Sequence, residues 1–330
     1  MDSAVNRTMV MLRAGNQRWL AYASLLVLSA IWGGTFFIVK DATREFPVLA
    51  FLVVRFFIAC LFLIPLTVVA FVRLRYRPPA RHWAWGIFAG VLYTAGFVFQ
   101  TFALRLIDSG RAGFITGLYV VFVPFLAFVF LRYPVSLRVM LGAALAVLGM
   151  FVLGYAPGGT PLGDLLAVAC AFSFAAHIVV IERMPRDADW RFMALVQAVT
   201  VMILSGLLLP FLASLQGCTT DLCVALQPFK DPIPTELPGN VLAAAAFTGF
   251  FATAVGLSVQ VWAQRILPPS DAALIYALES PFSVVFGVLF LAEILTGAGV
   301  LGSGLIFAGV LVVTLLPSNQ HPHAAESATD

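Results

Sequence analysis

Two charged side chains, Arg55 and Glu279, lie inside long apolar stretches of the chain. Each follows the start of its stretch by about nine residues, which is about 14 Å along a helix and close to the middle of a bilayer. A charge at that depth is costly, so it generally serves a function or is paired. In one interpretation Arg55 binds a substrate carboxylate and Glu279 binds an amine or a proton. In the other, the two residues form a static ion pair, or Glu279 is protonated.

Two glutamines, Gln100 and Gln260, also lie within apolar stretches, and each precedes an arginine by five residues. Their amides are suited to hydrogen-bonding a substrate. They are equally suited to bonds between helices, which contribute about 0.6–2 kcal/mol each. Arg105 and Arg265 lie near opposite boundaries of the predicted spans, so we expect their side chains to extend to lipid headgroups.

His177 is the one histidine inside a predicted span. Imidazole titrates near neutral pH, which suits proton coupling. The alternative is a core histidine with a satisfied hydrogen bond, or one that reaches the cytoplasmic edge. Four aromatic residues are candidates to line an amphipathic cavity, with ordinary packing as the alternative for each: Trp32, Tyr93, Tyr119 and Tyr276.

Two prolines, Pro124 and Pro281, interrupt apolar stretches. Proline removes a backbone hydrogen bond and permits a kink, which neighbouring helices can accommodate inside a membrane. We predict hinges for gating at both positions, with static kinks as the alternative. Cys218 and Cys223 share one polar loop, and they can form a disulfide if that loop faces an oxidising compartment.

The composition indicates the class of protein. Hydrophobic residues make up 61% of the 330 residues and charged residues 11%, whereas soluble domains are about 25% charged. A spanning helix needs about 20 apolar residues. The stretches that meet this requirement number ten: 19–40, 46–71, 83–104, 109–131, 137–155, 162–182, 190–213, 240–263, 270–292 and 297–316. The net charge of +3 is small, and we expect the lipid bilayer and a small-molecule substrate as partners, and no nucleic acid.

Lys and Arg are distributed unevenly among the connections. With residues 1–18 as a cytoplasmic tail, most of them fall on the cytoplasmic side, for example Arg73, Arg75 and Arg77 between the second and third spans. The positive-inside rule therefore predicts that both termini are cytoplasmic, in a bacterial-type inner membrane. Residues 317–330 are expected to form a disordered cytoplasmic tail.

Segments in the first half of the sequence match segments in the second half, and these matches occur at two fixed separations along the chain, called here the longer and the shorter spacing. At the longer spacing, Gly96–Arg105 matches Gly256–Arg265, and the match continues through the next two spans. At the shorter spacing, 19–40 lies on 161–182, and the first two spans match the sixth and seventh more weakly. The sequence therefore predicts an all-α membrane protein of two five-helix repeats, residues 19–155 and 162–316. Because five is odd, the second repeat enters the membrane inverted, as in many transporters that bind substrate between their repeats.

Three features carry a resemblance to a known family: Ala30-Ile-Trp-Gly-Gly-Thr-Phe36, the paired Gln-x4-Arg motif, and Leu278-Glu-Ser-Pro-Phe282 with Phe290-Leu-Ala-Glu293 after it. Over nearly its whole length the chain resembles the EamA-type branch of the drug/metabolite transporter (DMT) superfamily. Ser280 before the proline and Ala292 in place of a glycine depart from that family's pattern. The resemblance implies a ten-helix carrier built of two EamA-like repeats, commonly an exporter of amino acids or related metabolites.

We therefore predict a secondary transporter that exports small metabolites, such as amino acids or amphipathic compounds, by alternating access. No phosphate-binding loop indicates the use of ATP, and we expect no cofactor or metal. A membrane-embedded enzyme is one alternative, but motifs such as His-Glu-x-x-His are absent from the sequence, so we expect no enzymatic activity. A membrane scaffold is the other alternative, and it would not need Arg55 and Glu279 at the midplane.

Overall fold

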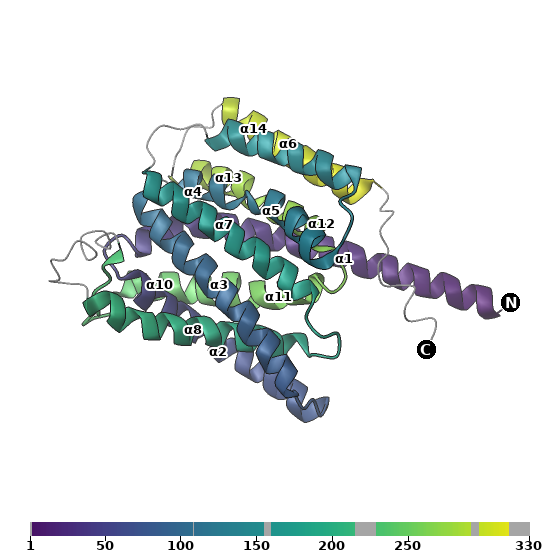
Figure 1. Ribbon diagram of the computed structural model, residues 1–330, viewed down its shortest axis with the longest axis horizontal. Coiled ribbons are helices and arrows are strands. Elements are labelled where there is room, and N and C mark those ends of the chain that lie inside the picture. Colours follow the sequence, from purple (N-terminus) through teal and green to yellow (C-terminus); the bar gives the residue numbers. More distant parts are fainter. Residues whose placement is uncertain (1, 108, 155–159, 215–228, 292–296, 317–330) are drawn as a thin grey trace.

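The computed structural model describes residues 2–107, 109–154, 160–214, 229–291 and 297–316, and this part of the chain is helical and contains no β-strand. Figure 1 shows the helices side by side along the long axis of the molecule, with the beginning of α1 projecting beyond the bundle. The unbroken helices are α1 (Asp2–Ala42), α2 (Val48–Arg73), α3 (Ala80–Leu106), α6 (Leu137–Gly154), α7 (Pro161–Glu182), α8 (Trp190–Ser214) and α14 (Gly297–Leu315).

Three further helical segments are interrupted. They are α4 (Ser109–Thr116), α5 (Tyr119–Leu126) and the π-helix η1 (Ala127–Leu131); α10 (Gly239–Phe247), the π-helix η3 (Thr248–Val255) and α11 (Gly256–Ala263); and α12 (Pro269–Tyr276) and α13 (Glu279–Leu291). The turn between α4 and α5 is at residues 117–118, and the turn between α12 and α13 is at residues 277–278. These two breaks are related by the longer of the two spacings at which the sequence matches itself.

Seven helices of the described residues are long and apolar enough to cross a membrane. They correspond to the first four predicted spans and to the sixth, seventh and eighth. The fifth and tenth are apolar but shorter, as α6 and α14, and the predicted span 270–292 is divided into α12 and α13. The prediction of a multi-pass α-helical membrane protein is confirmed, whereas ten crossings remain a prediction.

Proline marks the start of many helices. It precedes the first residue of α2, α3, α10 and α12 and is the first residue of α7: Pro47, Pro79, Pro238, Pro268 and Pro161. The first turn of a helix has amides without an intrahelical acceptor, so the missing N–H of proline costs nothing there.

The two halves of the chain are interleaved. The largest helix–helix interfaces join the first half with the second: α6 with α14, α3 with α7, and α2 with α8. Figure 1 shows α6 beside α14 at one edge of the bundle and α2 near α8 at the other. A Cβ added to Gly149 of α6 would lie 2.5 Å from the carbonyl oxygen of Gly302 of α14, so glycine permits this close contact. The interior of the bundle is therefore built from both halves.

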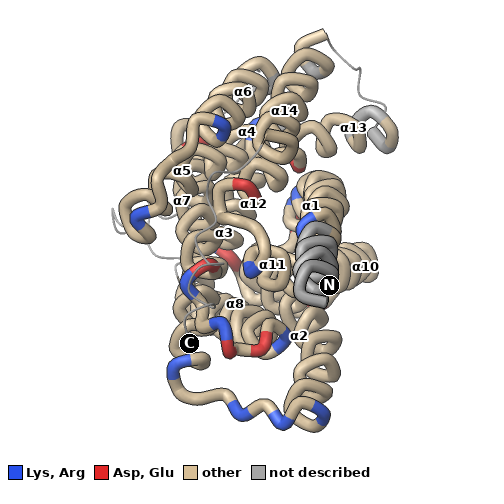
Figure 2. The backbone as a smooth tube through the Cα atoms, turned by 90° about the vertical axis from the view of Figure 1, so that its right-hand side faces the viewer, with Lys and Arg blue, Asp and Glu red and all other residues tan. Residues whose placement is uncertain are grey.

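Basic residues gather at the end of the bundle where α1 begins. Figure 2 looks at this end, and its basic segments include the connection between α2 and α3, which contains Arg75 and Arg77. At the start of α3, Arg81 forms an ion pair with Asp187 of the connection before α8. A basic end is typical of the cytoplasmic face of a membrane protein.

Candidate functional site

A cavity lies between the two halves of the chain, with walls from helices of both. Its lining residues are Trp32, Thr35, Phe36, Arg55, Tyr93, Phe97, Gln100, Tyr119, Phe174, His177, Ile178, Gln260, Tyr276 and Glu279. About 50 Å³ of the cavity admits the centre of a water molecule. A water needs roughly 10–15 Å³ on the same measure, so the cavity has room for a few waters but not for a larger solute.

The eight residues predicted to bind substrate all line this one cavity, and so does the proton-coupling candidate His177. They come from helices along almost the whole chain, from α1 to α13, so their meeting is a result of the tertiary structure. Their roles remain predictions.

Arg55 and Glu279 line the same cavity but do not bind each other. The Nε of Arg55 donates a hydrogen bond to Oγ1 of Thr253 at 2.9 Å. The carboxylate of Glu279 accepts a hydrogen bond from the hydroxyl of Tyr119 at 3.0 Å. Among the described residues no carboxylate forms an ion pair with Arg55. The alternative of a static Arg55–Glu279 pair is therefore wrong.

The π-helix η3 positions the guanidinium of Arg55. The hydroxyl of Thr253 donates to the carbonyl of Thr248, five residues earlier, at 3.0 Å, which leaves an oxygen lone pair for Nε of Arg55. Gly249 of the same π-helix lets α2 come close, because an added Cβ would lie 2.6 Å from the Arg55 carbonyl oxygen. The guanidinium carbon lies 4.5 Å from the centre of the Phe97 ring. Arg55 is thus held in place by a hydroxyl and an aromatic face, and its charge is not neutralised by either.

His177 lines the same cavity and is completely buried. Its Nε2 lies 2.6 Å from Oε1 of Gln197, and its ring stacks on Tyr93 at 4.4 Å between ring centres. This supports the core-histidine interpretation in part, because one ring nitrogen has a partner. The other nitrogen, Nδ1, has no hydrogen-bond partner in the part of the chain that the structure describes.

Trp32 and Tyr276 lie together in the lining of the cavity. Their ring centres lie 5.1 Å apart, and the indole N–H of Trp32 donates to the carbonyl of Ala252 in η3 at 2.9 Å. Because that bond satisfies the indole, Trp32 presents its aromatic surface to the cavity.

Several buried polar atoms at the cavity have no hydrogen-bond partner among the described residues. They are the hydroxyls of Tyr93 and Tyr276, Oε1 of Gln260 and Nδ1 of His177. Buried polar groups are nearly always hydrogen-bonded in proteins. Four unpaired polar atoms at one cavity therefore indicate that a polar ligand binds there and supplies the missing hydrogen bonds. We interpret the cavity as a binding site on this ground.

The cavity walls follow the two repeat spacings of the sequence. Gln100 and Gln260 are related by the longer spacing, and so are Tyr119 and Glu279, which bind each other directly. At the shorter spacing, Trp32 corresponds to Phe174. The matching halves therefore meet at this cavity. Glu279 of the second half occupies the position that Tyr119 has in the first half.

Comparison with known proteins agrees with this architecture. The sequence model of the EamA-like transporter family matches residues 19–155 and, a second time, residues 161–315. The chain belongs to the EamA-like transporter family, and hence to the DMT superfamily.

An uncharacterized transporter of Archaeoglobus fulgidus is 34% identical to this chain over 304 residues, which covers 91% of this chain and 88% of that protein. A second uncharacterized transporter from the same organism is 24% identical over 299 residues, covering 90% and 98%. A crystal structure shares the fold with a TM-score of 0.65 and 20% identity, covering 91% of this chain and 97% of the other.

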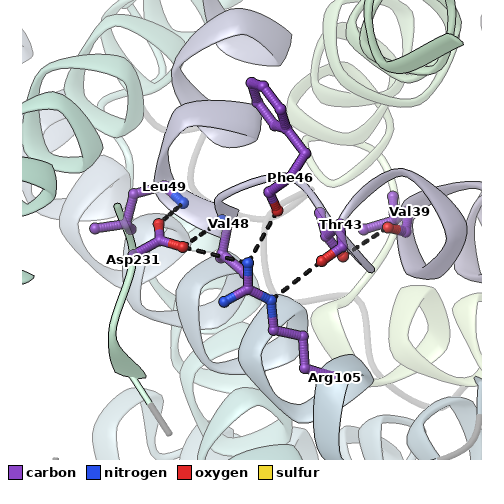
Figure 3. A network of polar contacts seen from close by, with 7 residues as sticks. All are labelled: Val39, Thr43, Phe46, Val48, Leu49, Arg105 and Asp231. Atoms are coloured by element: carbon purple, nitrogen blue, oxygen red, sulfur yellow. Dashed lines mark hydrogen bonds and ion pairs between the residues drawn. The ribbon is translucent and has the colours of Figure 1, made fainter. Parts of the chain in front are cut away.

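In this transporter Arg105 is part of a polar network at the end of the bundle opposite the beginning of α1 (Figure 3). Its guanidinium donates to the carbonyls of Thr43 at 3.1 Å and Phe46 at 2.9 Å. It also forms an ion pair with Asp231 at 3.3 Å. The expectation that Arg105 extends to headgroups is therefore wrong. Arg265 is bound in a similar way, to the carbonyl of Ala188 at 2.5 Å.

Asp231 completes the network from the connection before α10. Its two oxygens accept the backbone amides of Val48 at 2.8 Å and Leu49 at 2.6 Å, and so cap the start of α2. Burial raises the pKa of the Asp231 carboxyl above its usual range, and the hydrogen bonds from Leu49 and Val48 and the charge of Arg105 act against that rise.

Replacing Asp231 by Ala is expected to lower the stability of the transporter by about 2–3 kcal/mol, because it leaves two helix-terminal amides without an acceptor and the guanidinium of Arg105 without its counter-charge. Thermal unfolding in detergent measures the change. Glu236→Ala is the matched control, since Glu236 is an exposed acid of the same connection. Equal midpoints for the two variants would show that the network does not stabilise the fold.

Sequence reasoning missed two further ion pairs of the spans. Arg111 pairs with Asp164, and Arg138 pairs with Asp271. Arg111 and Asp271 are related by the longer spacing, so the self-match already placed opposite charges at equivalent positions. Thr253 had no such signal, because a threonine in a membrane helix is common.

The two prolines predicted as hinges lie at different distances from the breaks in their helices. Pro124 lies inside α5, and the helix breaks before it, at residues 117–118, whereas Pro281 closely follows the break at 277–278. Their role in gating remains a prediction. Cys218 and Cys223 lie outside the described residues.

Proposed function

We propose that this protein is a secondary transporter that exports a small zwitterionic or amphipathic metabolite by alternating access. The observation that carries the proposal is the cavity, which is lined both by a buried cation, Arg55, with no acidic partner among the described residues and by a buried carboxyl group, Glu279. The export direction follows from the family resemblance.

The proposal includes ten membrane-crossing helices in two inverted repeats, residues 19–155 and 162–316, with both termini cytoplasmic. The double match to the family supports the repeats. The equivalent helix breaks at 117–118 and 277–278 support them too, as does the Tyr119–Glu279 contact. The basic end of the bundle supports the orientation in a plasma membrane.

Each polar group has a proposed role. Arg55 binds a carboxylate with the guanidinium nitrogens that Thr253 does not use, and Glu279 binds an amine or takes up a proton. Gln260 and the hydroxyls of Tyr93 and Tyr276 supply the remaining hydrogen bonds. An aromatic wall accepts the apolar part of the solute, because such rings combine apolar area with a polar edge.

Alternating access is supported by the narrow cavity. With room for only a few waters, it has to widen toward one membrane face and then toward the other for a solute to pass. Pro281, beside the break between α12 and α13, and Pro124, inside α5, are the proposed bending points.

The direct test is transport by purified protein in proteoliposomes. Vesicles are loaded with a panel of radiolabelled amino acids, their decarboxylated amines and their deaminated acids, and loss of label is followed against protein-free vesicles. The proposal expects transport of at least one zwitterion and weaker transport of both analogues. Chemical conversion of a compound without its movement would favour a membrane enzyme instead.

Replacing Thr253 by Val is expected to weaken transport several-fold, mainly through a higher KM, because the guanidinium of Arg55 loses the bond that orients it. A hydrogen bond from a charged donor contributes about 1.5–3 kcal/mol, and only part of this is lost from transport because Thr253 orients Arg55 and does not itself bind the carboxylate. Thr253→Ser keeps the hydroxyl and serves as the control. A maximal rate lowered alike in both variants, with KM unchanged, would contradict an orienting role.

A further inference from the structure

Two polar clusters lie at opposite ends of the bundle and have opposite arrangements of charge. At the far end from the beginning of α1, Nε and Nη2 of Arg111 in α4 bind both carboxylate oxygens of Asp164 in α7, at 2.7 and 2.8 Å. At the near end, Asp271 of α12 accepts from the hydroxyl of Tyr22 in α1 at 3.1 Å. Nη2 of Arg138 in α6 also approaches Asp271, at 3.2 and 3.3 Å.

The two clusters occupy equivalent positions of the two repeats. The longer spacing of the self-match relates Arg111 to Asp271, and the shorter spacing relates Tyr22 to Asp164. In one cluster the cation is on the fourth predicted helix, and in the other the anion is on the ninth. Each cluster joins the first half of the chain to the second.

Both clusters are close to the cavity along the chain. Gly113, two residues after Arg111, accepts a hydrogen bond through its carbonyl from Ser280 at 3.2 Å, directly beside Glu279. Tyr276, which lines the cavity, follows Asp271 by five residues, or about 7.5 Å of helix. A movement of α4 or α12 at its cluster therefore reaches the binding site.

We infer that Arg111–Asp164 and Tyr22–Asp271–Arg138 are the two latches that close the cavity toward opposite membrane faces. The inference rests on the proposed transport function, since only an alternating transporter needs to open each end in turn. Both latches are intact together, and this agrees with the narrow cavity between them. The Arg105–Asp231 network involves neither α4 nor α12, so it lies in the part of the bundle that stays in place when either latch opens.

The latches differ in burial. The side chains of Arg111 and Asp164 are 27% and 30% exposed, whereas those of Arg138 and Asp271 are 7% and 1% exposed. An ion pair that water can reach contributes little, but breaking a buried one leaves a charge without compensation. Removing one partner of the buried latch at the N-terminal end therefore has the larger effect on access.

The experiment measures access to the cavity without any substrate. In a chain whose four cysteines are replaced by Ala, Thr35→Cys reports the cavity, and a membrane-impermeant maleimide is applied to right-side-out and to inverted vesicles. Arg77→Cys, in the connection after α2, shows which preparation exposes the N-terminal end. Asp271→Asn is expected to raise labelling from that end about tenfold or more, and Asp164→Asn to raise it from the opposite end by less.

A second set of variants tests whether misfolding, and not the opening of a latch, causes the increased labelling. The double change Arg138→Gln with Asp271→Asn removes both charges of this latch, so it is expected to raise labelling from the same end, but by less than Asp271→Asn, which leaves Arg138 without a counter-charge. Tyr22→Phe also gives a smaller rise from that end. Labelling that rises from both ends alike, or from neither in the double variant, would overturn the latches. One-sided labelling in a protein that moves no solute would keep the latches and refute the proposed function.

Discussion

Replacing Arg55 by Gln is expected to reduce transport of a carboxylate-bearing substrate by roughly ten- to a hundredfold, because a charge-assisted hydrogen bond contributes about 1.5–3 kcal/mol. Arg55 is 2% exposed and lines the cavity, so its loss is not replaced by water. The effect is measured as kcat/KM in proteoliposomes for a zwitterion and for its decarboxylated amine. The amine is expected to lose much less, since it has no carboxylate to bind.

Two further variants make this test specific. Arg55→Lys keeps the charge but loses the planar fork, and an intermediate loss is expected. Arg44→Gln removes an exposed arginine from the connection between α1 and α2 and is expected to change nothing. Equal losses for the zwitterion and the amine would show that Arg55 stabilises the bundle and does not bind the substrate carboxylate.

Replacing Glu279 by Gln is expected to abolish the response of transport to an imposed pH gradient and to lower the kcat/KM of amine-bearing substrates about tenfold or more. The carboxyl group is the one acidic side chain among the residues that line the cavity. The amide of Gln keeps an oxygen that accepts the Tyr119 hydroxyl, so the fold is expected to be preserved. Transport is followed in vesicles with and without a pH difference across the membrane.

The alternative proton carrier is His177, and the same assay distinguishes the two. His177→Gln is expected to keep the pH response, because Gln197 already holds one ring nitrogen of the histidine at 2.6 Å. Tyr119→Phe removes the partner of Glu279 but not its charge, and it is expected to shift the pH profile without abolishing it. A pH response that survives Glu279→Gln and disappears in His177→Gln would reverse the assignment.

Much of the candidate site was predictable from sequence because polar residues are rare in membrane-spanning helices and are therefore easy to recognise. An arginine or glutamine in an apolar run is costly wherever it faces lipid, so Arg55, Gln100, Gln260 and Glu279 had to face the interior. The family match over residues 19–155 and 161–315 agrees with the repeat that the two spacings indicated. The aromatic residues were less distinctive, because rings also pack in any membrane core.

The partners of these residues were not predictable in the same way. Depth along a helix put Arg55 and Glu279 at one level, but depth does not determine which way each side chain points. Each helical residue is rotated by about 100° from the one before, and the π-helix η3 changes that rotation locally, which brings Thr253 to Arg55. Arg105 was misjudged for a similar reason, because its partner Asp231 comes from a distant connection.

By itself, then, the sequence determined that the chain is a multi-pass helical membrane protein with an internal repeat and a polar interior, since apolar length and the cost of buried polarity are properties of the chain alone. Only the tertiary structure decided that the polar residues share one narrow cavity, that Arg55 is held by Thr253 and not by Glu279, and that ion pairs join the halves at both ends. Those outcomes depend on how helices rotate and break when they pack, and no single segment specifies that.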